Sequence, residues 1–121
     1  MNPEHLWQRY ARIWSSEPAL RAAELETCLA DRCSYCDVNG LIEGREALSS
    51  YMGGLQQSVK GGKFEIRSVM HHHDRMLAEW KLIGGDGIVL QTGRSFATAS
   101  ADGRLQNITG FFDSGLKERF A

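Results

Sequence analysis

The chain has 121 residues, of which 42% are hydrophobic and 24% are charged. This length and balance are typical of one compact domain and argue against a disordered protein or a membrane protein. Fourteen basic and fifteen acidic residues are interspersed and give a formal net charge of -1, so the chain lacks the basic stripe that nucleic-acid binding requires.

The sequence contains no continuous apolar stretch of the length that a secretory signal or a membrane span needs. Its three cysteines, Cys28, Cys33 and Cys36, are an odd number and too few for a disulfide scaffold. We therefore expect a cytoplasmic protein that forms one domain over residues 1–121.

Two helices are predicted at the start of the chain. Pro3 suits a first helical turn, and apolar residues then recur at spacings of three and four, which predicts an amphipathic helix over residues 3–15. Ser16 is the expected cap of a second helix that runs to about Asp31.

A short strand and a third helix follow. Residues 33–38 alternate in polarity and precede Asn39-Gly40, which predicts a strand that ends in a turn, with Asp37 at its exit. The third helix begins after Gly44, and its apolar residues allow it to end near Gly53-Gly54 or to continue to Val59.

From residue 64 onward the apolar pattern has a period of two. It predicts four strands joined by hairpin turns, at residues 64–72, 76–83, 88–98 and 105–112. Helices followed by an antiparallel meander indicate an α+β fold, in which a curved sheet wraps around the helices and leaves a conical cavity.

Strand alternation predicts which side chains face this cavity. The expected inward set is Met76, Ala78, Trp80 and Leu82 on the second meander strand, and Ile88, Leu90, Thr92, Arg94, Phe96 and Thr98 on the third. His72 shares the alternation of Phe64, Ile66 and Met70 and is expected at the cavity mouth. The pattern leaves the face of the last strand open, and we expect Phe111 rather than Phe112 to point inward.

Four segments together resemble the nuclear transport factor 2-like superfamily, and within it the SnoaL-like and ketosteroid isomerase-like branches. They are QRYARIW, CDVNGLIEGREAL, LAEWKLIGGDG and DGRLQNITGFFD, and they extend over nearly the whole chain. The resemblance implies a cystatin-like curved sheet with a small-molecule cavity. It is less specific for chemistry, because one fold supports many activities.

Ketosteroid isomerases use an aspartate base and an oxyanion hole made of a tyrosine and a protonated aspartate. By resemblance, Asp37 is the base and Tyr10 is the oxyanion tyrosine. Arg94 stands nearest the place of the second acid, and this departure disfavours steroid isomerisation. A fixed cation there would instead bind a carboxylate or an enolate.

Each of these residues also has a purely structural interpretation. Asp37 at a strand end can shape the turn through local backbone amides, or it can lie desolvated in the cavity and transfer protons. Tyr10 can be a core residue with a tethered hydroxyl. A buried Arg94 needs an anion, which Asp37, Asp113 or a ligand would supply.

The histidines and cysteines do not predict a metal site. Neighbouring residues in the run His71-His72-His73 point to opposite faces of a strand, and Cys33 and Cys36 do the same. The sequence also lacks a phosphate-binding loop and a nucleophile elbow, so we expect no metal and no cofactor.

The sequence therefore favours an enzyme of the isomerase, cyclase or hydratase type that acts without a cofactor on a small apolar carbonyl compound. The expected wall of its site consists of Trp14, Met52, Trp80, Phe96 and Phe111. The alternative is a non-catalytic binding or assembly module of the same fold. A homodimer is expected through the outer sheet face, with Val69, Leu77, Val89 and Ala97.

Overall fold

The computed structural model describes residues 1–113, which form three helices and six strands. The elements are α1 (Pro3–Ile13), α2 (Pro18–Cys28), β1 (Leu29–Asp37), β2 (Gly40–Glu43), α3 (Arg45–Ser58), β3 (Lys63–His72), β4 (Arg75–Ile83), β5 (Val89–Ala99) and β6 (Leu105–Phe112). The α+β class and the four-stranded meander predicted from the sequence are confirmed.

The first two helices begin at side chains that accept hydrogen bonds from the first helical turn. The Asn2 side chain accepts from the His5 amide at 2.8 Å, and the Glu17 carboxylate accepts from the Leu20 amide at 2.7 Å. Ser16, the expected cap of α2, instead donates to a carbonyl at the end of α1. None of the described helices is long and apolar enough to cross a membrane.

The element boundaries differ from the prediction around β1. Helix α2 ends at Cys28, and β1 starts directly at Leu29 rather than at residue 33. The Asn39-Gly40 turn leads into β2, a strand that the sequence pattern did not reveal because it has four residues and little buried surface. Helix α3 follows the longer of the two alternatives and continues through Gly53-Gly54 to Ser58.

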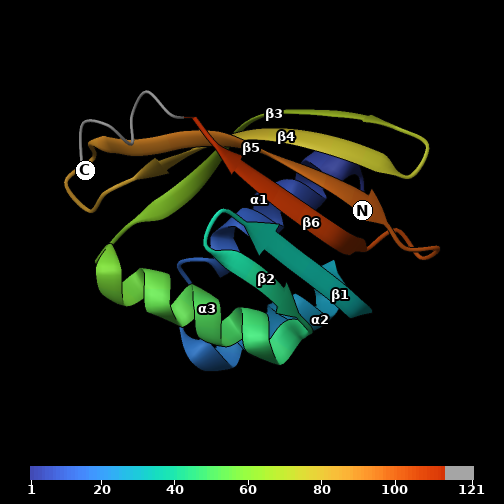
Figure 1. Ribbon diagram of the computed structural model, residues 1–121, viewed down its shortest axis with the longest axis horizontal. Coiled ribbons are helices and arrows are strands. Elements are labelled where there is room, and N and C mark those ends of the chain that lie inside the picture. The colour runs from blue at the N-terminus through green and yellow to red at the C-terminus, as the bar shows by residue number, and fades with distance from the viewer. Residues whose placement is uncertain (114–121) are drawn as a thin grey trace.

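The six strands form one sheet in the order β2-β1-β6-β5-β4-β3. All neighbouring pairs are antiparallel except β1 and β6, which are parallel. In Figure 1 the strands β3 to β6 arch over the top of the view and the helices lie beneath them. The core lies between the helices and the concave face, with Trp7, Ile13, Leu25, Met52, Leu105 and Ile108 almost fully buried.

A bulge in β3 changes which of its side chains face the core. The pairing of β3 with β4 shifts register between Ile66 and Ser68. Beyond such an irregularity the alternation continues one residue out of phase. Val69 therefore packs against the core, whereas Met70 is 62% exposed and His72 is also exposed. The expected alternation of Met70 and His72 with Phe64 is wrong.

The alternation predicted for β5 is also wrong. Its inward residues include Gly93, Ser95 and Ala97, which pair with the inward residues of β4. Gly93 lies opposite Trp80, and a Cβ atom at Gly93 would stand 2.4 Å from the indole ring. Trp80 thus requires glycine at position 93, so the row of β5 that contains Arg94 and Phe96 faces outward.

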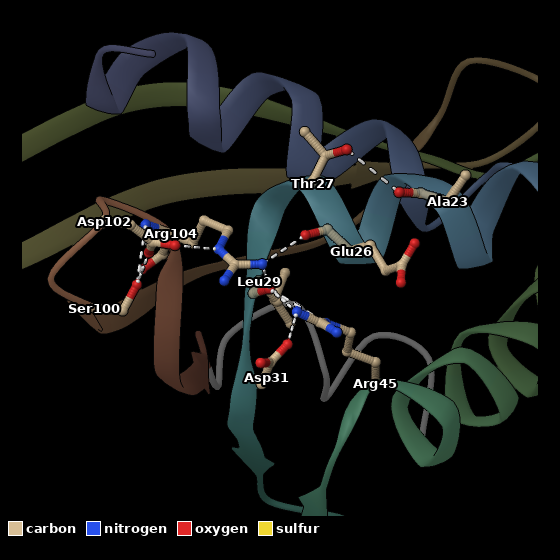
Figure 2. Close-up of polar contacts among 9 residues, drawn as sticks. All are labelled: Ala23, Glu26, Thr27, Leu29, Asp31, Arg45, Ser100, Asp102 and Arg104. Carbon is tan, nitrogen blue, oxygen red and sulfur yellow. Dashed lines mark hydrogen bonds and ion pairs between the residues drawn. The ribbon is translucent and has the colours of Figure 1, made fainter.

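Two arginines fasten the end of α2 to other parts of the chain, as Figure 2 shows. Arg104, just before β6, donates to the carbonyl oxygens of Glu26 at 2.9 Å and Leu29 at 3.2 Å. Arg45, at the start of α3, donates to the same Leu29 oxygen at 2.8 Å. Positive charge at a helix C-terminus also complements the helix dipole. These contacts connect the end of α2 with the start of α3 and with the residue that precedes β6.

Replacing Arg104 by Ala should lower the free energy of unfolding by about 1–2 kcal/mol, because two carbonyl oxygens lose a charged donor. Urea denaturation would measure the change. The matched control is Arg75→Ala, which removes an exposed arginine paired with Asp74 at 2.7 Å and should cost less than about 1 kcal/mol. Equal effects of the two substitutions would contradict the role assigned to Arg104.

Candidate functional site

A cavity of about 690 Å³ lies between the helices and the concave face of the sheet. This volume is in the usual range for small-molecule sites, about 300–1,000 Å³. The residues that line it are Trp7, Tyr10, Ala11, Trp14, Tyr35, Asp37, Asn39, Ser50, Tyr51, Gly54, Leu55, Ser58, Phe64, Ile66, Trp80, Leu82, Gln91, Ser95 and Phe112.

Asp37 is buried in the cavity wall and accepts three hydrogen bonds. The hydroxyl groups of Tyr35 and Tyr51 donate to its Oδ2 atom at 2.8 and 2.7 Å. The backbone amide of Asn39 donates to Oδ1 at 2.7 Å. Only 8% of the residue is exposed. All three partners act as donors, and an ionised carboxylate, which is purely an acceptor, matches this arrangement.

The two interpretations of Asp37 that the sequence left open are therefore compatible. The hydrogen bond to the Asn39 amide shapes the turn between β1 and β2, as expected for an aspartate at a strand end. At the same time the carboxylate lines the cavity. Because Oδ2 already accepts two bonds and Oδ1 accepts one, Oδ1 retains acceptor capacity for a further proton.

Tyr35 and Tyr51 come from different elements and both remain protonated. Tyr35 lies two residues before Asp37 on β1, so their side chains share a face of the strand, and Tyr51 lies on α3. Burial raises the pKa of both phenols, and the adjacent Asp37 carboxylate raises each pKa further. Both hydroxyls therefore keep donating to Asp37 at physiological pH.

Tyr10 lines the cavity, as expected, but its hydroxyl is not among the groups that bond Asp37. The Tyr10 hydroxyl and the Trp7 indole nitrogen are buried without a hydrogen-bond partner among the described residues. Burial raises the pKa of Tyr10. Buried polar groups without partners are uncommon, so these two donors mark an unusual region of the cavity wall.

Aromatic rings form a continuous wall around the cavity, with Trp14 at its centre. The Trp14 ring lies 5.5 Å from Tyr35, 6.1 Å from Tyr51 and 5.4 Å from Phe64, measured between centroids. The wall continues from Phe64 to Trp80 at 5.3 Å. The Trp14 and Trp80 positions expected from the sequence are thus found at the cavity.

Arg94 and Phe96 do not face the cavity. Both lie on the outward row of β5, because Trp80 admits only small residues on the inward row. Arg94 is exposed and lies 3.4 Å from Asp113, one of the three partners considered for it. The prediction that Arg94 and Phe96 line the site is therefore wrong.

Met52, His72 and Phe111 also lie away from the cavity. Met52 is fully buried in the core beside the cavity wall, because the apolar stripe of α3 packs against the other elements there. The β3 bulge leaves His72 exposed. On β6 the inward row contains Phe112, which lines the cavity, whereas Phe111 is 63% exposed.

Among residues 1–113, no three histidine, cysteine or acidic side chains come close enough to bind a metal ion together. His71 lies 3.4 Å from Glu4 of α1, and the rings of His72 and His73 approach each other at the β3–β4 turn. The cysteines are free thiols: Cys28 and Cys33 are buried and Cys36 is half-buried.

Several residues of the site were not predicted from the sequence, most importantly Tyr35 and Tyr51. Tyr35 carried a usable signal, since residues two apart on a strand share a face and Asp37 was already a candidate. Tyr51 belongs to the apolar stripe of α3, but its separation of 14 residues from Asp37 in the sequence hid the contact. Phe64 was expected on the same row as His72 but was not named as a site residue, and no prediction was made for Trp7.

The fold and the cavity define an α+β protein with a cystatin-like curved sheet. The chain belongs to the SnoaL-like domain family, whose model matches residues 7–108. It matches none of the curated proteins.

Several solved structures share the fold at low sequence identity. A proposed isomerase of the SnoaL-like family from Agrobacterium tumefaciens has a TM-score of 0.84 and 22% identity, over 90% of this chain and 95% of the other. A proposed polyketide cyclase from Sinorhizobium meliloti has a TM-score of 0.70 and 17% identity, over 88% and 93% of the two chains.

A third structure, from Catenulispora acidiphila, has a ketosteroid isomerase-like fold and contains trimethylamine. Its TM-score is 0.75 at 15% identity, over 93% of this chain and 88% of the other. At these identities the three likenesses establish the fold and not the chemistry.

Replacing Gly93 by Ala should displace Trp80 and lower the free energy of unfolding by about 1–3 kcal/mol, because the added methyl group would meet the indole and the Phe111 carbonyl at 2.4 Å. Urea denaturation and the indole N–H signal of Trp80 would measure both effects. Gly40→Ala is the matched control, since a Cβ there meets nothing within 4 Å. A normal Trp80 signal in Gly93→Ala would contradict the packing argument.

Proposed function

We propose that this protein is a cofactor-independent enzyme that moves a proton next to a carbonyl group in a small, largely apolar ligand. Asp37 is the general base of this proposal. The observation that carries it is the carboxylate in the cavity wall with two tyrosine hydroxyls on one oxygen. The donors fix the orientation of the base, and positioned bases of this kind are effective catalysts of proton transfer.

The hydrogen-bond arrangement assigns the proton to one atom of Asp37. Oδ2 is occupied by both phenols, so a C–H proton of the ligand would transfer to Oδ1. The electron pair of the broken C–H bond would move onto the carbonyl oxygen and form an enolate. Isomerisation and cyclisation both proceed from such an intermediate, in keeping with the proposed activities of the solved neighbours.

Tyr10 remains the proposed donor to the enolate oxygen. Its buried hydroxyl has no described partner, and a ligand oxygen would supply one. The hydroxyl is enclosed by protein atoms, however, so a ligand reaches it only when neighbouring side chains of the wall move. The role of Tyr10 therefore requires a movement of side chains that the role of Asp37 does not require.

The enclosed Tyr10 hydroxyl and the outward Arg94 also favour a second candidate function. Without a fixed donor for a developing oxyanion, the cavity would bind a small molecule and leave it unchanged. In this case Asp37 would orient the ligand as a hydrogen-bond acceptor. The two functions differ in whether bound carbonyl compounds exchange protons with solvent.

Exchange of the protons next to the carbonyl group in deuterated water, followed by NMR for a panel of small ketones and thioesters, tests the proposal. Asp37→Asn should lower the exchange rate at least about 100-fold, because the base is lost. Tyr51→Phe should lower it less, since Tyr35 and the Asn39 amide still hold the carboxylate.

Asp74→Asn, at the exposed β3–β4 turn, is the matched control and should leave the rate unchanged. Full exchange activity in a folded Asp37→Asn protein would refute the proposed base. Binding without exchange in the unaltered protein would establish the second function.

We also propose a homodimer through the outer face of the sheet, in which Leu77 keeps its expected place and the other expected residues are replaced. Val69 and Ala97 face the core, and Val89 is half-buried. An outward row of cross-strand neighbours instead runs over five strands: Met70, Leu77, Phe96, Thr109 and Cys36. A largely apolar row on a sheet face suits a second copy packed around a two-fold axis.

Phe96→Glu should convert the dimer to a monomer, because the carboxylate would be buried without a partner. Size-exclusion chromatography with light scattering would measure the mass. Leu20→Glu makes the same chemical change on α2, where Leu20 is 52% exposed, and should leave the mass unchanged. A monomer mass for the unaltered protein would rule out the dimer.

The cytoplasmic location and the extent of the domain over residues 1–121 stay predictions.

A further inference from the structure

The charges and rings of the cavity indicate what kind of ligand it selects. All three tryptophans and all three tyrosines of the chain line it, together with Phe64 and Phe112. Among the described lining residues, Asp37 is the one charged group, and no lysine, arginine or histidine accompanies it. Arg94, which was expected to supply a cation, points outward to Asp113.

The O–H and N–H groups of these tyrosines and tryptophans are mostly unavailable to a ligand. The hydroxyls of Tyr35 and Tyr51 donate to Asp37, and the Trp80 indole N–H donates to Ser95 at 3.0 Å. The Trp7 and Tyr10 donors are enclosed by protein, so a ligand reaches them only when side chains of the wall move. A ligand therefore meets aromatic ring surfaces more than N–H or O–H donors.

This combination disfavours an anionic ligand and favours a cation. An anion would add a second negative charge beside Asp37 with no cation to balance it, and it would find few donors. A positively charged nitrogen would balance Asp37 and interact with the electron-rich faces of the rings. The other polar residues of the lining are neutral and do not change this balance: Asn39, Ser50, Ser58, Gln91 and Ser95.

We propose that the cavity selects small ligands that carry a positively charged nitrogen, an ammonium or quaternary ammonium group. The inference rests on the same cavity and the same Asp37 as the proposed function and specifies its substrate class. A cationic ligand also suits the proposed proton transfer. When the C–H bond of a cationic ligand breaks, the proton neutralises Asp37 and the ligand becomes a zwitterion, so the buried site has no net charge before or after the step.

Three isosteric probes that differ in charge test this inference. They are choline, its uncharged analogue with a tert-butyl group in place of the trimethylammonium group, and the tert-butylacetate anion. The indole N–H signals of the three tryptophans, all at the cavity, report binding in NMR titrations. Choline should bind roughly tenfold more tightly than the uncharged analogue, and the anion should bind most weakly.

Asp37→Asn should weaken choline binding and leave the uncharged analogue nearly unaffected, whereas Asp74→Asn should change neither. Equal or tighter binding of the uncharged analogue, tighter binding of the anion, or no binding of choline would overturn the inference. If Asp37→Asn does not fold, the order of the three probes with the unaltered protein decides alone. The proton-exchange assay is independent of this order, so either proposal can fail without the other.

Discussion

The hydrogen bonds to the Asp37 carboxylate connect parts of the chain that the site depends on. They join β1 through Tyr35, the β1–β2 turn through the Asn39 amide, and α3 through Tyr51. A buried carboxylate is costly unless donors surround it, so the three partners must be in place together. The carboxylate thus connects α3 to the sheet, and its donors hold the orientation of the candidate base.

The second constraint is the fit between large and small residues on the concave face. Trp80 extends over Gly93, and its N–H is satisfied by Ser95, so the indole fills space that larger β5 side chains would otherwise occupy. This fit determines the shape of the cavity wall. It also explains why the inward residues of β5 beside Trp80 are Gly93 and Ser95.

Much of the fold could be predicted from the sequence, because helix periodicity and strand alternation are local patterns. The four meander strands agree with the structure to within one residue, and Asp37, Tyr10, Trp14 and Trp80 were correctly placed at the cavity. The prediction of which strand face points inward failed where contacts between residues distant in the sequence decide it. The β3 bulge and the Trp80–Gly93 contact reversed the expected alternation, and so removed His72, Arg94 and Phe96 from the site.

The parallel pair β1–β6 has a consequence for how the protein reaches its native state. Ser34 lies opposite Asn107, a separation of 73 residues, whereas the meander strands pair with near neighbours in sequence. Pairing of distant segments is slow, because a long loop must be ordered first. Since Asp37 lies at the end of β1, the candidate site forms only when this late contact closes. A chain in which only the β3–β6 hairpins had formed would therefore lack the ligand cavity.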